Sequence, residues 1–142
     1  MEIKPYLRKT QYYETDQMGI IHHANYVYWM EEARVDFMEQ MGFGYRQAVE
    51  AGIDFAVLGL SCRYHKMVRF GEEVQIEISI SRLTATRMTV AYRILGPDGT
   101  LRATGESEHC YFSGRLQRPV SLPKALPELY ALFRSVCTQA EG

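Results

Sequence analysis

The chain has 142 residues, of which 46% are hydrophobic and 23% charged, a composition typical of a folded globular protein rather than a disordered or fibrous one. Sixteen lysine and arginine residues against seventeen aspartate and glutamate residues give a formal net charge of -1, which argues against nucleic acid as a partner. No apolar run approaches the ~20 residues of a membrane span. Charged residues also occupy the N-terminal segment where a signal peptide needs an apolar core, so we expect a cytoplasmic protein.

Cysteine and histidine spacing favours neither a disulfide framework nor a metal site. The three cysteines, Cys62, Cys110 and Cys137, are odd in number and far apart, which is typical of reduced thiols that serve mainly as small packing residues. His22 and His23 are adjacent, and neighbouring side chains of an extended chain point in opposite directions, so the two cannot easily share a metal ion. We therefore expect no metal cofactor.

The first long element is predicted to be a helix of about four turns, preceded by a short N-terminal strand. From Tyr26 to Met41, apolar side chains recur at spacings of three and four residues, as they do on one face of a helix. Asn25 is expected to cap the N-terminus of this helix. Gly42 is expected to end it, because glycine adopts the left-handed cap conformation without steric cost.

Four later segments have the composition or the alternation of β-strands. Residues 55–70 are rich in β-forming side chains, and Gly59 within them suggests a bulge. Apolar and polar residues alternate over residues 74–80 and again over residues 88–94. A "GPDG" turn then leads into residues 100–112, so the last three segments predict an antiparallel meander.

The C-terminal part is predicted to be helical. Pro119 is expected to end the sheet region, and residues 126–136, with a proline in the first turn, should form a closing helix. A short helical connector is expected between the long helix and the strands, and the absence of repeats and flexible linkers predicts one domain, residues 1–142. The long helix, with apolar residues such as Val27 and Val35 round much of its circumference, suits burial inside one curled antiparallel sheet, an α+β fold.

The run from Tyr13 to Arg34, "YETDQMGIIHHANYVYWMEEAR", resembles the N-terminal signature of the 4-hydroxybenzoyl-CoA thioesterase-like branch of the hotdog-fold acyl-CoA thioesterases. The matching positions include Thr15, Asp16, Gly19, Ile20, Ile21, His23, Asn25, Tyr26, Glu31, Ala33 and Arg34. The resemblance implies a hotdog fold, in which a curved antiparallel sheet wraps around one long central helix. It also implies hydrolysis of an acyl-CoA without metal or redox cofactor, coenzyme A being part of the substrate. The chain departs from that branch at His22, where an aromatic residue is common, so the acyl group is not predicted.

Thioester hydrolysis needs a group that attacks the carbonyl or activates water, and donors that stabilise the negative charge growing on the carbonyl oxygen. By resemblance, the carboxylate of Asp16 is the nucleophile or the general base, and the backbone amide of His23 polarises the carbonyl. A helix N-terminus has free N–H groups and a partial positive charge, so the amides of about residues 23–26 are suitable donors. Gly19 would turn the chain so that the carboxylate and the helix face one carbonyl. The alternative for Asp16 is an ordinary turn residue.

Other residues are candidates for holding the substrate. Asn25 and Tyr26 lie at the start of the helix, and Glu31 follows on it as a second acid, an orienting group or the ion-pair partner of Arg34. The phosphates of coenzyme A need cations, and the resemblance favours Arg87. The other cations considered are Arg63, Lys66, Arg69 and Arg82. Two further histidines in strand segments, His65 and His109, are expected to have packing roles.

Two other functions remain open: hydrolysis of an acyl group on acyl carrier protein, and noncatalytic acyl binding on the same scaffold. A hotdog dehydratase is disfavoured, because the sequence has no separate aspartate and histidine pair at the spacing that such enzymes use. One sheet around one helix leaves an edge strand unpaired and gives an acyl chain no second wall. We therefore expect a homodimer, or a homotetramer formed from two dimers, with sites shared between chains.

Overall fold

The computed structural model describes residues 1–138; residues 139–142 of the predicted domain lie outside the described residues. The elements in chain order are β1 (Tyr6–Lys9), the 3-10 helix η1 (Tyr12–Glu14), α1 (Asn25–Met41), α2 (Tyr45–Glu50), β2 (Ile53–Tyr64), β3 (Glu73–Leu83), β4 (Arg87–Leu95), β5 (Leu101–Ser113), β6 (Arg118–Pro119), α3 (Leu122–Ala125) and α4 (Pro127–Val136).

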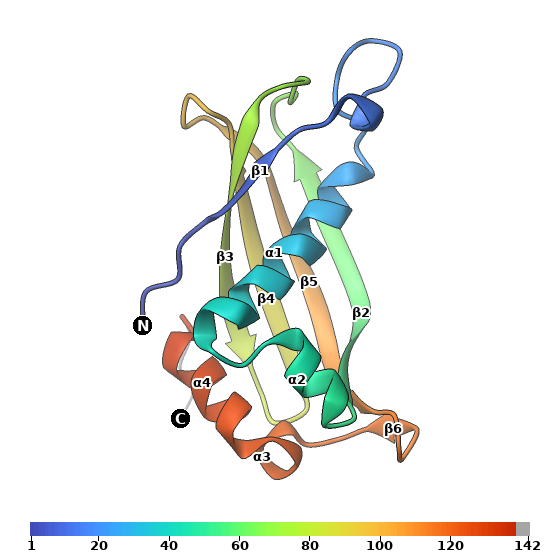
Figure 1. Cartoon of the computed structure of the whole chain (residues 1–142), viewed down its shortest axis with the longest axis vertical. Coiled ribbons are helices and arrows are strands. Elements are labelled where there is room, and N and C mark those ends of the chain that lie inside the picture. The colour runs from blue at the N-terminus through green and yellow to red at the C-terminus, as the bar shows by residue number, and fades with distance from the viewer. Residues whose placement is uncertain (139–142) are drawn as a thin grey trace.

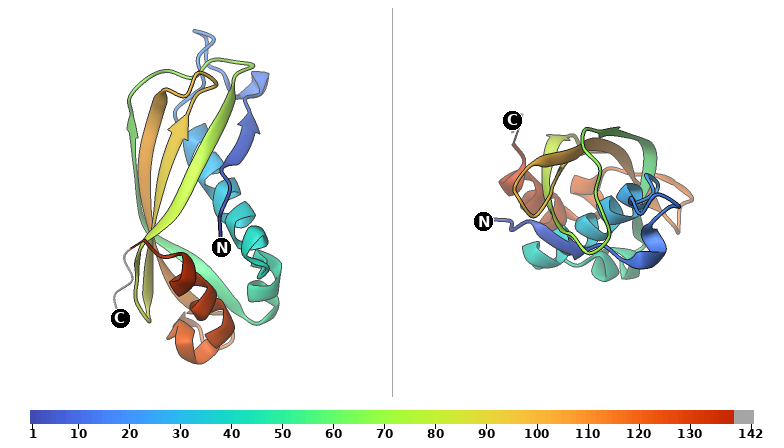
Figure 2. Two further views of the ribbon diagram at one scale, coloured as in Figure 1. Left: turned by 90° about the vertical axis from the view of Figure 1, so that its left-hand side faces the viewer. Right: turned by 90° about the horizontal axis from the view of Figure 1, so that it is seen from above.

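The strands form one antiparallel sheet in the order β1-β3-β4-β5-β2, with β6 added to β5. The sheet curls around α1, while α3 and α4 lie at one end of it (Figures 1 and 2). The predicted hotdog architecture is therefore confirmed, and so is the antiparallel meander, formed by β3, β4 and β5. β6 ends the sheet at Pro119, as predicted, where Pro119 pairs with Phe112 of β5.

One face of α1 supplies the centre of the core. Its buried residues are Tyr26, Trp29, Met30, Ala33, Phe37, Met38 and Met41. Gly42 ends the helix in the left-handed conformation, with φ of 84°, as predicted. The predicted burial of the apolar residues round much of the helix was wrong for Val27 and Val35, which lie on the outer face and are 37% and 38% exposed. A single curled sheet covers only the side of α1 that faces it.

The predicted cap at the start of α1 was also wrong. Ala24 occupies the N-cap position, already in a helical conformation, and Asn25 is the first residue of the helix. The amide Nδ2 of Asn25 donates to the carbonyl oxygens of Glu14 and His22, at 2.9 and 3.1 Å. Because its side chain donates outward instead of accepting from the helix, Asn25 ties the preceding loop to α1.

β2 is shorter than predicted and ends at Tyr64. Beyond it, the N–H groups of His65 and Lys66 both donate to the carbonyl oxygen of Arg102, so the chain folds away from the strand ladder. The predicted bulge is confirmed by a register shift between Val57 and Gly59. This early end of β2 allows the chain after Tyr64 to border the N-terminal end of α1.

Candidate active site

The loop between η1 and α1 is closed by a tight turn at Asp16. Gly19 adopts φ of 71°, and the backbone N–H of Asp16 donates to the carbonyl oxygen of Ile20 at 2.9 Å. The Oδ1 atom of Asp16 accepts from the N–H groups of Met18 and Ile20, at 2.8 and 3.3 Å. Within residues 1–138, the other carboxylate oxygen of this exposed side chain has no hydrogen-bond partner. Asp16 is thus a turn residue that also presents a free oxygen to solvent.

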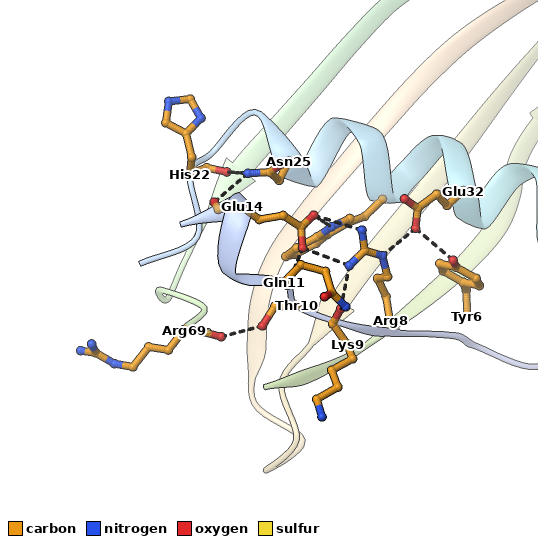
Figure 3. A network of polar contacts seen from close by, with 11 residues as sticks. Tyr6, Arg8, Lys9, Thr10, Gln11, Glu14, His22, Asn25, Glu32 and Arg69 are labelled. Atoms are coloured by element: carbon orange, nitrogen blue, oxygen red, sulfur yellow. Dashed lines mark hydrogen bonds and ion pairs between the residues drawn. The ribbon is translucent and has the colours of Figure 1, made fainter. Parts of the chain in front are cut away.

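A buried ion pair anchors this loop to β1 and α1 (Figure 3). The carboxylate of Glu14, whose residue is 3% exposed, accepts from two nitrogens of Arg8, at 3.0 and 3.1 Å. It also accepts from Nε1 of Trp29 and from the backbone N–H of Gln11, both at 2.8 Å. Arg8 continues the network by donating to Glu32 at 2.9 Å. The segment just before Asp16 is therefore fixed to two elements of the core.

The protonation of Arg8 follows from these contacts. Burial lowers the pKa of Arg8, but hydrogen bonds to Glu32 and Glu14 outweigh burial and hold the pKa above its ordinary value. The network was missed from the sequence, because nothing local connects Arg8 with the signature that begins at Tyr13.

A cleft of about 260 Å³ lies where the loop, the N-terminus of α1 and the end of β2 meet. Its lining residues are Asp16, Ile20, Ile21, His23, Tyr26, Tyr64, His65, Lys66 and Met67. The structure thus brings together four predicted site residues: Asp16, His23, Tyr26 and Lys66. His65 is exposed in this cleft rather than packed in a strand, so its predicted packing role was wrong.

Aromatic side chains connect the two walls of the cleft. Tyr64 Oη donates to the carbonyl oxygen of His23 at 3.0 Å, and the rings of Tyr26 and Tyr64 meet edge to face, with centroids 4.9 Å apart. Burial raises the pKa of both phenols to about 12, so each keeps its proton at neutral pH. Neither tyrosine is therefore a base there, and Asp16 supplies the carboxylate that lines the cleft.

Only part of the predicted row of amide donors is free. The N–H groups of Asn25, Tyr26 and Val27 donate to backbone carbonyl oxygens three residues earlier, and that of Ala24 donates to Nδ1 of His22. Along the described chain, no group accepts the N–H of His23. The expectation that the amides of residues 23–26 are all free to bind the carbonyl oxygen was therefore wrong. Those of residues 24–26 donate within the first turn, and the N–H of His23 is the one left free among these four.

The other predicted site residues, Gly19, Asn25, Glu31, Arg63 and Arg87, lie outside the cleft lining. Arg63 precedes Tyr64 on β2, and successive strand residues point to opposite faces, so its exposed side chain is directed away from the cleft. Glu31 is exposed on α1. Its considered ion-pair partner, Arg34, instead donates to Tyr92 Oη at 3.0 Å. A role for Glu31 in binding substrate stays a prediction.

Arg87 lies toward the other end of the sheet. Strand pairing places it opposite Cys110, which pairs with Ala56 on β2, whereas Tyr64 borders the cleft. From Ala56 to Tyr64 the strand runs roughly 26 Å at about 3.3 Å per residue. Arg87 and Arg82 line a separate cleft of about 250 Å³. One chain alone therefore does not bring Arg87 to Asp16.

Two further observations concern cofactors and membranes. The described residues hold no group of three or more histidine, cysteine, aspartate and glutamate side chains arranged to bind a metal ion. Within residues 1–138, no helix combines the length and the apolar character needed to cross a bilayer.

A curled sheet around one helix, with a cleft at the helix N-terminus that contains an aspartate, defines the molecule as a hotdog-fold protein of the thioesterase type. The sequence profile described as the thioesterase-like superfamily matches residues 10–131, so the chain belongs to this superfamily. The resemblance of its N-terminal signature is thereby confirmed, and the chain is a thioester hydrolase.

Three similar proteins illustrate the relationship. A Bacillus subtilis protein, provisionally named an acyl-CoA thioesterase, is 30% identical and is matched over 88% of this chain and 91% of its own length. An acyl-CoA thioester hydrolase from Escherichia coli is 24% identical over 83% of this chain and 88% of its own. The structure of a DHNA-CoA thioesterase from Staphylococcus aureus superposes with a TM-score of 0.89 at 28% identity, covering 93% of this chain and 89% of that one.

Proposed function

We propose that the protein hydrolyses an acyl-CoA to a free acid and coenzyme A. The observation that carries this proposal is the pairing, in one cleft, of the free carboxylate oxygen of Asp16 with His23, whose backbone N–H is unoccupied among the described residues. An acid and a donor at one site are what thioester hydrolysis needs. The acyl-CoA class is carried over from the names of the similar proteins.

The two residues have different parts in the reaction. The carboxylate of Asp16 attacks the thioester carbon and expels the thiolate, leaving a mixed anhydride that water cleaves, or it takes a proton from the water that attacks. In both routes the carbonyl oxygen becomes negative and accepts from the N–H of His23, beside the positive end of the α1 dipole. Lys66 in the cleft supplies a cation for coenzyme A phosphates. No metal or redox cofactor takes part in this scheme.

We also propose a homodimer, which can pair again into a tetramer. β2 is an edge strand that pairs only with β5 among the described strands, and its Val57, Leu58 and Leu60 are exposed. An open apolar edge is suited to pairing with a second copy. Antiparallel pairing of two β2 strands would bring the Arg87 end of one chain toward the Asp16 cleft of its partner, where Arg87 would contact coenzyme A.

A panel of acyl-CoAs assayed for thiol release tests the activity. We expect release by the wild-type protein and its loss in Asp16→Asn. Acyl-CoA binding without release would identify a noncatalytic acyl-binding module. Release from acyl carrier protein alone would select the carrier-protein thioesterase. The cytoplasmic location stays a prediction.

A further inference from the structure

A second cavity lies inside the sheet beneath the C-terminal half of α1, lined by different residues from the Asp16 cleft. Its volume is about 30 Å³. Its lining residues are Arg34, Phe37, Met38, Tyr45, Phe55, Ile78, Ile80, Met88, Val90, His109 and Phe133. The polar exceptions among these apolar walls are Arg34, Tyr45 and His109.

A line of hydrogen bonds runs from Arg34 to His109 across β4 and β5. Nη1 of Arg34 donates to Tyr92 Oη at 3.0 Å, Tyr92 Oη lies 2.6 Å from Ser107 Oγ, and this atom lies 2.7 Å from Nε2 of His109. Tyr92, Ser107 and His109 are at most 1% exposed. The line stops at Nδ1 of His109, which is buried and finds no partner within the described chain. A buried polar atom without a partner is costly, so this nitrogen points to a ligand.

Arg34 fixes the direction in which the protons of this line point. A guanidinium only donates, so Tyr92 Oη accepts from Arg34 and gives its own proton to Ser107, the other partner that the structure offers it. Ser107 then donates to Nε2 of His109. Burial first, and the charge of Arg34 second, lower the pKa of His109 to about 4, so the ring is neutral at pH 7. Its single N–H is consequently at Nδ1 and needs an acceptor.

We propose that this cavity binds a carbonyl oxygen at the far end of a mainly apolar acyl group, and that the N–H at Nδ1 of His109 donates to it. Arg34 can only donate, the one nitrogen of His109 left without a partner is the donor at Nδ1 because Nε2 accepts from Ser107, and the hydroxyl of Tyr45 already donates to Asp54. A ketone oxygen, which only accepts, therefore suits the walls better than a hydroxyl. The volume is two to three times the ~10–15 Å³ that one water needs, which gives room for a ketone and its neighbouring carbon but not for a ring.

The identity of the ligand rests on the proposed function, since the acyl group belongs to the proposed substrate. Tyr45 and Phe55, which line the cavity, are partly exposed, so its wall reaches the surface beside β2. From Phe55 to Tyr64, β2 runs roughly 30 Å at about 3.3 Å per residue, too far for the cleft of the same chain. Antiparallel pairing of two β2 edges would bring this cavity toward the cleft of the partner subunit. The acyl group would then start in one subunit and end in the other.

The first test is independent of activity. In the full-length protein with ¹⁵N-labelled histidine, NMR at pH 7 should show His109 as the neutral tautomer protonated at Nδ1. Ser107→Ala should weaken that preference, because it removes the proton donated to Nε2. A wild-type ring protonated at Nε2 would overturn the assignment of the donor and the proposal with it.

The second test measures binding to the Asp16→Asn protein by calorimetry. The probes are straight-chain acyl-CoAs of increasing length and their analogues with a ketone at the penultimate carbon. At one matching length the keto analogue should bind about tenfold more tightly, as one hydrogen bond allows. His109→Phe in the same background should abolish this preference. Tyr111→Phe is the control, because it removes another buried polar group of β5 that does not line the cavity.

Each outcome decides the proposal. A preference for the keto analogue that persists in His109→Phe would overturn the proposal, and so would the lack of any preference in the parent protein. In either case the N–H at Nδ1 of His109 would donate to a buried water instead of to the substrate. Failure of every acyl-CoA to bind would overturn it too. Binding with the expected preference, but without thiol release by the wild-type protein, would reject the proposed hydrolase activity and keep the subsite.

Discussion

Asp16→Asn separates the chemical role of Asp16 from its role in the turn. Asparagine keeps the oxygen that accepts from the N–H groups of Met18 and Ile20, so the loop should hold its shape and the melting temperature should change little. It removes the negative charge, and we expect kcat for thiol release to fall at least ~100-fold, the low end of what a positioned base contributes. An unchanged kcat would remove Asp16 from the mechanism.

The donor at His23 is predicted to be the backbone and not the imidazole. His23→Ala keeps the N–H and should cost less than ~10-fold in kcat, whereas His23→Pro deletes it and should cost ~100-fold or more, as loss of an oxyanion donor does. Since no described group accepts this N–H, the proline removes no hydrogen bond of the fold. Melting temperatures measured with the kinetics check this. Equal losses in the two variants would assign the chemistry to the side chain.

The sequence predicts one wall of the cleft and not the other. Asp16, Gly19 and His23 lie within one short segment, and the resemblance of that segment to the family signature predicts a common site. Tyr64 reaches His23 from 41 positions along the chain, and no local pattern signals that meeting. The sequence also did not predict that the N–H groups of Asn25, Tyr26 and Val27 are already hydrogen-bonded. These bonds form because the turn before α1 is helical, whereas an extended cap would leave the N–H groups free.

At the scale of elements, the ion pair between Arg8 and Glu14 should hold the loop to β1 and α1. Removing one partner of a buried pair typically costs ~3–5 kcal/mol, whereas removing both costs less. We therefore expect Glu14→Gln to lower the free energy of unfolding in urea, and the double variant Arg8→Met with Glu14→Gln to recover part of that loss. If the two single losses simply add, the pair is not coupled and the loop is held by its other bonds.

His109 on β5 predicts a pH dependence of stability. Its pKa is lowered to about 4 in the folded protein by burial, while an unfolded histidine titrates near ~6.5. Between these values only the unfolded chain binds the proton, so acidification from pH 6.5 to pH 4 favours unfolding. The melting temperature should therefore fall more steeply over this range in the wild-type protein than in His109→Phe. Parallel curves would mean that His109 binds its proton over the same pH range in the folded and the unfolded chain.

Periodicity was sufficient for the elements whose burial is one-sided. It predicted α1 and the strands β3 and β4, whereas β5 was predicted from the turn that precedes it. It failed at the end of β2, where bonds from His65 and Lys66 to Arg102 override the β-forming composition. It also overestimated the burial of α1, because a sequence does not say whether an apolar residue such as Val27 faces its own core or another chain.

At the scale of the whole molecule, the single chain exposes two apolar features. The β2 edge exposes Val57 and Leu58, and the outer face of α1 exposes Val27, Tyr28 and Val35. A second copy with antiparallel β2 would cover the edge and give the cleft a second wall. This is the arrangement that the separation of Arg87 from Asp16 also requires, if both serve one substrate.

Mixed refolding tests the shared site directly. Asp16→Asn should be inactive, and Arg87→Glu should raise KM more than it lowers kcat, because it repels the coenzyme phosphates. If Arg87 serves the partner's cleft, a heterodimer of the two variants has one native site and one doubly altered site. Equal mixing then gives heterodimers in half of the population and restores about a quarter of wild-type activity at low acyl-CoA concentration. A proven heterodimer without restored activity would reject the placement of Arg87, and light scattering that shows a fully active monomer would reject the dimer.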